Sequence, residues 1–210
     1  MNSIALATAA LVVLTFTGQV QAKKLVRESS NSHSFEADSD EQYRRPTKEA
    51  ESGMELRKLR RAAVGAQAAG ALGFGGALIE INFNSTWGLT AGFGGGEGFQ
   101  AYEIQSKYVL AGDWLMPYMS FGFAHWKSIG HTGHISKTNP AILGEKLLNE
   151  DEKAAGEYAK NLLYPGIGLQ YLQLKGDWAG SSVYAEITIL LDVGNFVAAP
   201  TGSLGFLYYF

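Results

Sequence analysis

From residue 75 onward, hydrophobic and polar residues alternate along successive short segments. A period of two is typical of a β-strand, because successive side chains point to opposite faces of the sheet. In the first of these segments Ile79 and Ile81 share one face, while Glu80 and Asn82 share the other. The pattern recurs in seven segments, which we expect to be strands: 75–84, 86–95, 99–110, 114–125, 165–175, 182–193 and 200–210.

Charged residues occupy the polar face of several of these strands. An ordinary β-sandwich core does not tolerate such residues unpaired, but a barrel accounts for them if they point into a polar lumen and pair there. We favour a structural salt-bridge network over a proton or ion path, because the interior of an eight-stranded barrel is only just wide enough for side chains. The predicted lumen residues are Glu80, Glu103, Lys107, Glu186 and Asp192.

The last strand ends the chain on an aromatic residue, and its large apolar side chains share one face: Leu204, Phe206, Tyr208 and Phe210. This ending resembles the closing strand of Gram-negative outer-membrane β-barrels. The resemblance implies an all-β fold, a transmembrane antiparallel up-and-down barrel in the outer membrane, with outer-membrane lipids as surroundings. In that family the terminal aromatic strand is also the signal that the barrel-assembly machinery reads.

Bacterial single-chain barrels have an even number of strands, so an eighth strand is expected. It falls in 61–72, where the periodicity does not decide between a strand and a helix. Counting back from a periplasmic C-terminus makes three tight connections periplasmic turns. These are Asn84–Ser85, residues 111–113 and residues 175–177.

The interruption at 126–164 then becomes one long extracellular loop. Its second half, 141–162, has the apolar spacing and the charges of a helix. Barrel strands do not need this segment, and loops carried by a rigid scaffold often hold the function. We therefore expect specific function to reside in this loop.

The N-terminus has the layout of an exported protein. The apolar run 5–16 is followed by a small-x-small site at 20–22, so residues 1–22 have the layout of a secretory signal peptide. Residues 23–60 predict a flexible, polar periplasmic tail. At its end, 54–63 has the spacing of a short basic helix, which we interpret as solvated in preference to bound to anionic lipid headgroups.

Composition narrows the function classes. A net charge of -3 gives no reason to expect a nucleic acid partner, and the absence of cysteine excludes a disulfide scaffold. No later segment is long and apolar enough for a second helical span. Outward aromatic residues near strand ends fit an interfacial girdle, whereas Trp114 and Trp126 fall on the inward phase. The predicted girdle residues are Phe83, Trp87, Tyr108 and Phe123.

Histidines give the only candidate chemistry. His131 and His134 lie three residues apart, but a histidine pair in a Gly-rich loop is a weak metal signal, and we expect no metal or cofactor. The sequence from His134 to Ser136 is similar to the His-x-Ser element of outer-membrane lipid A deacylases, which implies a general base and a nucleophile. Lys137 stands where that family has Asn, and the element lies far from the C-terminus.

Three functional hypotheses follow. The first is a non-enzymatic outer-membrane barrel that is structural or binds a surface partner through 126–164. The second is a lipid-modifying enzyme that uses His134 and Ser136. The third is a secreted barrel that binds an apolar ligand, like a lipocalin, which requires apolar residues inside and polar residues outside.

Overall fold

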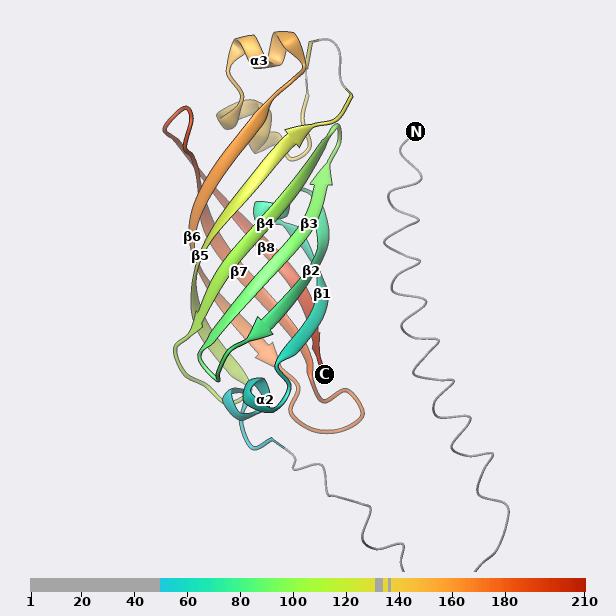
Figure 1. Ribbon diagram of the computed structural model, residues 1–210, viewed down its shortest axis with the longest axis vertical. Helices are drawn as coiled ribbons and strands as arrows, with labels where there is room; N and C mark the ends of the chain where they lie inside the picture. The colour runs from blue at the N-terminus through green and yellow to red at the C-terminus, as the bar shows by residue number, and fades with distance from the viewer. Residues whose placement is uncertain (1–49, 131–133, 136) are drawn as a thin grey trace, which may run out of the picture. The chain divides into compact units, whose positions relative to one another are not determined.

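The computed structural model describes residues 50–130, 134–135 and 137–210. A short helix, α2 (Gly53–Leu59), precedes eight strands (Figure 1). The strands are β1 (Ala62–Ala69), β2 (Gly75–Asn82), β3 (Trp87–Gly96), β4 (Phe99–Val109), β5 (Leu115–Ser128), β6 (Ala159–Leu172), β7 (Ser181–Asp192) and β8 (Val197–Tyr209). Within these described residues, no helix is both long enough and apolar enough to cross a membrane.

The strands close into a barrel. Each strand pairs antiparallel with the next along the chain, and β8 pairs with β1. The prediction of an eight-stranded up-and-down barrel is therefore confirmed. We call the end that carries α2 and the C-terminus the lower end, and the opposite end the upper end (Figure 1).

The first strand settles a question that periodicity left open. Residues 62–69 form a strand, and the chain then turns through the short 3-10 helix η2 (Gly70–Leu72). Ala71 and Leu72 are almost fully buried, and η2 contacts strands on opposite sides of the barrel. The connection between β1 and β2 therefore folds inward and fills part of the lumen.

The two faces of the strands differ as expected. Along β4, residues 101, 103, 105 and 107 are buried, while Tyr102, Ile104 and Tyr108 are exposed. The same alternation runs through β2, β5, β6 and β7. The outside of the barrel is therefore apolar, and most of the charged residues of the strands lie inside. This is the reverse of a soluble ligand-binding barrel, so the lipocalin-like hypothesis is wrong.

Two strands are longer than predicted. β5 continues to Ser128 and β6 begins at Ala159, which leaves residues 129–158 as the β5–β6 loop in place of 126–164. The helical prediction for 141–162 holds only in part, for the π-helical turn η3 (Leu143–Leu147) and helix α3 (Glu150–Ala155). Residues 159–162 are strand, because Lys160 and Leu162 continue the inward alternation of β6.

Part of the predicted N-terminal tail is folded. The predicted signal peptide and the tail up to residue 49 lie outside the described residues. Residues 53–59 form α2, whose Leu56 and Arg57 side chains are buried. The interpretation of this basic helix as solvated is therefore wrong for Arg57, which enters the barrel to meet a carboxylate.

Two apolar clusters lie at the ends of the lumen. The upper cluster contains Trp126 and Leu162 of the barrel together with Leu143 and Leu147 of the β5–β6 loop. The lower cluster brings Leu56 of α2 against Met116, Leu172 and Tyr209. Polar residues fill the space between these clusters.

Candidate functional site

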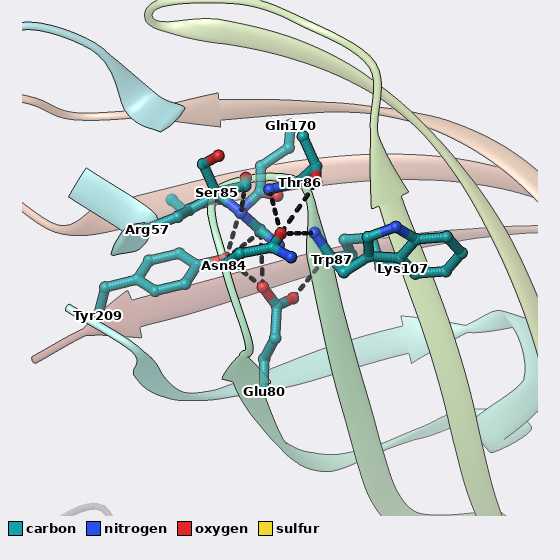
Figure 2. A network of polar contacts seen from close by, with 10 residues as sticks. Arg57, Glu80, Asn84, Ser85, Thr86, Trp87, Lys107, Gln170 and Tyr209 are labelled. Atoms are coloured by element: carbon teal, nitrogen blue, oxygen red, sulfur yellow. Dashed lines mark hydrogen bonds and ion pairs between the residues drawn. The ribbon is translucent and has the colours of Figure 1, made fainter. Parts of the chain in front are cut away.

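The centre of the lower lumen is the Glu80 carboxylate on β2 (Figure 2). Arg57 Nη1 lies 2.7 Å from Glu80 Oε1, and Lys107 Nζ lies 2.5 Å from Glu80 Oε2. The Tyr209 hydroxyl donates to Glu80 Oε1 at 2.6 Å. All four residues are 2% exposed or less. Charge-assisted hydrogen bonds at these distances offset the large desolvation cost of burying the charges.

This network joins elements that are distant in sequence. Arg57 comes from α2, Glu80 from β2, Lys107 from β4 and Tyr209 from the end of β8. The Tyr209 hydroxyl also accepts a hydrogen bond from Gln170 of β6 at 2.8 Å. The network therefore ties α2 to four strands around the barrel.

Helix α2 is held against the lower end by more than Arg57. Its first turn is capped by Ser52, whose hydroxyl accepts from the Glu55 backbone N–H at 3.2 Å. The helix and its C-cap residue, Arg60, then donate a hydrogen bond to each of the three lower turns. These bonds run from Gly53 N to Asp113 O (2.6 Å), from Arg57 Nε to Ser85 O (3.3 Å) and from Arg60 Nη1 to Ala179 O (2.5 Å). A helix of seven residues thus covers the lower mouth.

Two further carboxylates lie higher in the lumen. Glu103 Oε2 accepts from the Tyr164 hydroxyl at 3.2 Å, and Glu186 Oε1 accepts from Gln105 Nε2 at 2.8 Å. Lys107 Nζ lies beneath them, 4.8 Å from the centre of the Tyr118 ring. Charged and aromatic groups thus fill the middle of the barrel, as expected where eight strands leave little free width.

The fifth predicted lumen residue belongs to a separate group at the upper end. Asp192 lies 3.2 Å from Lys160 Nζ, which also lies 2.7 Å from Glu152 Oε2. Glu152 is part of α3, where it completes a capping box with Asn149. Lys160 is 3% exposed, so this ion pair anchors the β5–β6 loop to the barrel from inside.

The loop also closes the upper mouth. Leu143 and Leu147 are buried, and Trp126 Nε1 donates to the Ala71 carbonyl of η2 at 2.6 Å. In contrast, α3 has no buried residue and faces outward. On it, a hydrogen bond from Lys153 lowers the pKa of the exposed Glu150, and at the base of the loop burial raises the pKa of Tyr158 above its ordinary value.

The structure describes only one member of the predicted catalytic pair. His134 lies in the β5–β6 loop, whereas Ser136 and His131 lie outside the described residues. Over the described part of the chain, no three His, Asp or Glu side chains are grouped as a metal site requires. His125 is on the outer wall, where its Nδ1 lies 2.8 Å from Asn161 Oδ1.

The predicted outward aromatic residues are all exposed. At the lower end Trp87 and Tyr108 pack together with ring centres 4.9 Å apart, and Phe93 and Tyr102 form a second pair higher up, at 5.2 Å. Phe83 and Phe123 are exposed as well. The four residues of the predicted assembly signal, Leu204, Phe206, Tyr208 and Phe210, are also exposed.

The phase prediction was right for only one of the two inward tryptophans. Trp126 is fully buried beneath the loop, whereas Trp114 is 59% exposed and packs edge-on against Tyr171. Trp114 precedes the first residue of β5, so the alternation of the strand does not apply to it.

Of the three buried basic residues in these networks, sequence reasoning missed Arg57 and Lys160. Lys160 had a usable signal, since it continues the period-two series of Leu162 and Tyr164. Arg57 had none, because it is one of several basic residues on a single helical turn and only the docking of α2 selects it.

No family model and no curated protein matches the sequence. Several solved structures are similar to it, among them the following three. The N-terminal β-barrel domain of Pseudomonas aeruginosa OprF is 15% identical, with a TM-score of 0.47, over 71% of this chain and 98% of that chain. Two structures of Yersinia pestis Ail, one in a phospholipid bilayer nanodisc and one in a crystal, are 16% and 17% identical, with TM-scores of 0.39 and 0.35. Each covers 71% of this chain and, respectively, 99% and 97% of its own. By its own strand order, this chain is a closed eight-stranded antiparallel β-barrel.

Proposed function

We propose that this chain is an integral outer-membrane β-barrel of a Gram-negative bacterium. The exposed apolar wall supports this proposal. Residues such as Ile79, Ile104, Ile167 and Ile187 are 47–65% exposed on the outer face of the strands. An exposed apolar surface of this extent is costly in water but suits a lipid environment.

We further propose that the protein does not conduct solutes. The main support for this proposal is that buried apolar side chains close both ends of the lumen. Trp126, Leu143 and Leu147 at the upper end, and Leu56 and Met116 at the lower end, are 2% exposed or less. With the ion network between these layers, a hydrated path of porin type has no room.

A barrel without a conducting lumen acts through its surface. The β5–β6 loop is the largest connection. Lys160 fixes it to the barrel through Glu152 of α3, and no residue of α3 is buried. A segment that is anchored at its base and exposed at its tip suits recognition of a partner. The proposed role is therefore non-enzymatic, either structural or surface-binding through this loop.

The proposed partners follow from two parts of the outer surface, the apolar wall and the last strand, β8. Outer-membrane lipids would contact the apolar wall. The barrel-assembly machinery would read the outward residues of β8, namely Leu204, Phe206, Tyr208 and Phe210, during biogenesis.

The test begins with cell fractionation and unboiled gels. We expect a folded, heat-modifiable species in the outer-membrane fraction only. The purified protein in planar bilayers should show no porin-type conductance. A soluble periplasmic or secreted species without a heat shift would contradict the membrane proposal, and stable conductance steps would contradict the closed lumen.

A loop variant separates the structural role from surface binding. Replacing residues 139–152 by a short Gly-Ser linker removes all of η3 and the first half of α3 while retaining every strand. A matched variant exchanges the β7–β8 turn, residues 193–196, in the same way. If the loop binds a partner, adhesion of whole cells to host or bacterial surfaces falls in the first variant alone. Equal adhesion in both variants would favour the structural role.

A further inference from the structure

The outer wall has polar side chains near its upper end, on one side only. They occupy outward-facing positions of the adjacent strands β4, β5 and β6, and each is at least partly exposed: Gln100, His125, Lys127 and Asn161. On the strands to either side the corresponding positions are apolar, with Leu191 on β7 38% exposed and Phe93 on β3 52% exposed. We call the four polar residues the upper polar patch.

The register of the strands brings these four residues together. Gln100 lies directly across from Lys127, and His125 lies directly across from Asn161. His125 and Lys127 are two residues apart on β5 and therefore share its outer face. Directly opposite residues on one face of an antiparallel pair have Cβ atoms about 4.5–5.5 Å apart. The four side chains therefore form one continuous surface across three strands.

Two hydrogen bonds within this region involve the amide oxygens of the patch. The Tyr102 hydroxyl donates to Gln100 Oε1 at 3.2 Å. His125 Nδ1 lies 2.8 Å from Asn161 Oδ1, and because an amide oxygen only accepts, the histidine nitrogen is the donor. Within the described part of the chain, no side-chain hydrogen bond uses Gln100 Nε2 or Asn161 Nδ2. The two amide NH2 groups therefore remain available as donors.

Lys127 adds a positive charge to these donors. Among the ion pairs of the described residues, none includes Lys127. Its ammonium group has three N–H donors, and each of the two amides has two more. Hydrogen bonds from a cation to a phosphate oxygen are shorter and stronger than those between neutral groups. The chemistry of the upper polar patch therefore fits an anionic phosphate group.

Aromatic residues directly below the patch indicate its depth. Tyr102 and Phe123 face outward one position below Gln100 and His125, and they are 48% and 38% exposed. Outward aromatic residues of membrane barrels lie at the boundary between the apolar core of the bilayer and its headgroups. The patch above them thus lies at headgroup level, where a lysine ammonium group meets phosphate and water in place of acyl chains.

We propose that the upper polar patch binds the phosphate group of an outer-leaflet lipid, with Lys127 as the cation and Gln100 and Asn161 as the neutral donors. This inference rests on the proposed outer-membrane location, in which the upper end faces the outer leaflet. There the phosphate-bearing lipid is lipid A, so lipid A is the proposed ligand. Because the patch covers only β4, β5 and β6, the lipid is held at one position on the barrel.

The test compares vesicles that differ only in the phosphate groups of lipid A. The full chain is refolded in phosphatidylcholine vesicles that contain no lipid A, lipid A with both phosphates, or lipid A with both phosphates removed. We expect the urea midpoint, read from the folded band on unboiled gels, to rise with the phosphorylated lipid alone. Equal midpoints in all three vesicles, or an equal rise with both forms of lipid A, would overturn the proposal.

The same experiment separates this inference from the proposed membrane location. A folded band in phosphatidylcholine alone supports insertion into a bilayer, whether or not lipid A changes the midpoint. If no folded band forms in any vesicle, the membrane location fails, and the lipid site fails with it.

Two variants and one control assign the effect to the patch. Lys127→Gln removes the charge at similar length and should abolish more than half of the midpoint shift that phosphorylated lipid A causes. Asn161→Leu should reduce this shift less, because the cation remains. Lys146→Gln makes the same charge change at an exposed position of the β5–β6 loop and should keep the full shift. If Lys127→Gln keeps the full shift, or Lys146→Gln loses as much of it, the phosphate group binds elsewhere and the proposal is wrong.

Discussion

Tyr164 on β6 lies directly across from Gly122 on β5, and its phenol ring covers the place where a side chain of Gly122 would be. A Cβ atom on Gly122 would overlap the ring and lie 2.5 Å from the Tyr164 hydroxyl oxygen. The same relationship joins Tyr118 to Gly168 and Tyr184 to Gly205. Large rings opposite glycines thus fill a narrow lumen, and the hydroxyls of Tyr164 and Tyr184 donate hydrogen bonds to Glu103 and Gln67.

We predict that Gly122→Ala destabilises the barrel. The added methyl group forces the Tyr164 ring out of its position, and overpacking of this kind costs about 1–3 kcal/mol. The free energy of unfolding in urea, measured in detergent, should fall by that amount. In Tyr164→Ala the same glycine substitution should cost much less, because the ring that it displaces is gone.

Gly202→Ala is the matched control. Gly202 also lies in a strand, β8, but a Cβ atom there would meet its nearest atom at 3.4 Å, an ordinary contact. We expect its unfolding free energy to stay within about 0.5 kcal/mol of the parent protein. A loss equal to that of Gly122→Ala would show that the cost comes from the glycine backbone and not from the ring.

The Glu80 network leads to a second prediction, in which the order of the effects is informative. Arg57→Ala leaves Glu80 with Lys107, so we expect a loss of up to about 3 kcal/mol. Glu80→Gln leaves two buried cations without a carboxylate and should cost more, about 3–5 kcal/mol. Urea midpoints of the two variants measure this order.

Lys58→Ala controls for helix α2 itself. Lys58 is exposed on the same helix, and the substitution retains good helix propensity. Its unfolding free energy should change by less than about 0.5 kcal/mol. An Arg57→Ala variant as stable as Lys58→Ala would mean that α2 is not held through the lumen.

The buried Lys160 pair leads to a third prediction, about the β5–β6 loop. Lys160→Met removes the link to Glu152 and leaves Asp192 without a cation, so the loop should open more often. A loss of about 1.4 kcal/mol in loop anchoring raises the open population about tenfold. Trypsin cleavage within 137–153 should accelerate by about that factor, since cleavage follows the open population.

The control for this experiment is Glu150→Gln. It breaks the exposed pair with Lys153 but keeps every trypsin site in the loop. Exposed pairs contribute little to stability, so the cleavage rate should match that of the parent protein. Equal acceleration in both variants would indicate a general effect of charge on the protease.

The strand pattern of this chain was predictable because period two is a local property. Ile79 and Glu80 had to face opposite sides wherever the strand lay, and the five predicted lumen residues are all buried inside the barrel. The alternation also predicted the two faces of the terminal strand, where Phe206 is exposed and Leu207 is buried. Closure then followed from the unsatisfied edges that an open sheet would leave in lipid.

The two segments that close the ends of the lumen, α2 and the β5–β6 loop, were not predictable in the same way. Arg57 is buried because α2 docks across three turns that the sequence places far away, and no local pattern marks that docking. Leu143 and Leu147 fit an ordinary amphipathic helix, and only the long β5 and β6 strands bring them above the lumen. The positions of α2 and of the β5–β6 loop both depend on tertiary contacts between distant segments.

The apolar wall provides a final test, which depends on depth in the membrane. Ile167 is 61% exposed at the middle of the outward series of β6, between Leu163 and Tyr171. An arginine at the bilayer midplane costs about 2–4 kcal/mol, and the cost falls to about 0–1 kcal/mol near the interface.

Ile167→Arg should therefore lower the free energy of unfolding in phospholipid vesicles by about 2–4 kcal/mol. Gln100→Arg, next to Lys127 at the upper end of β4, should have little effect. If the two variants lost the same free energy of unfolding in vesicles, the result would contradict a wall that faces the membrane. An Ile167→Arg loss that is just as large for protein folded without lipid would contradict it as well.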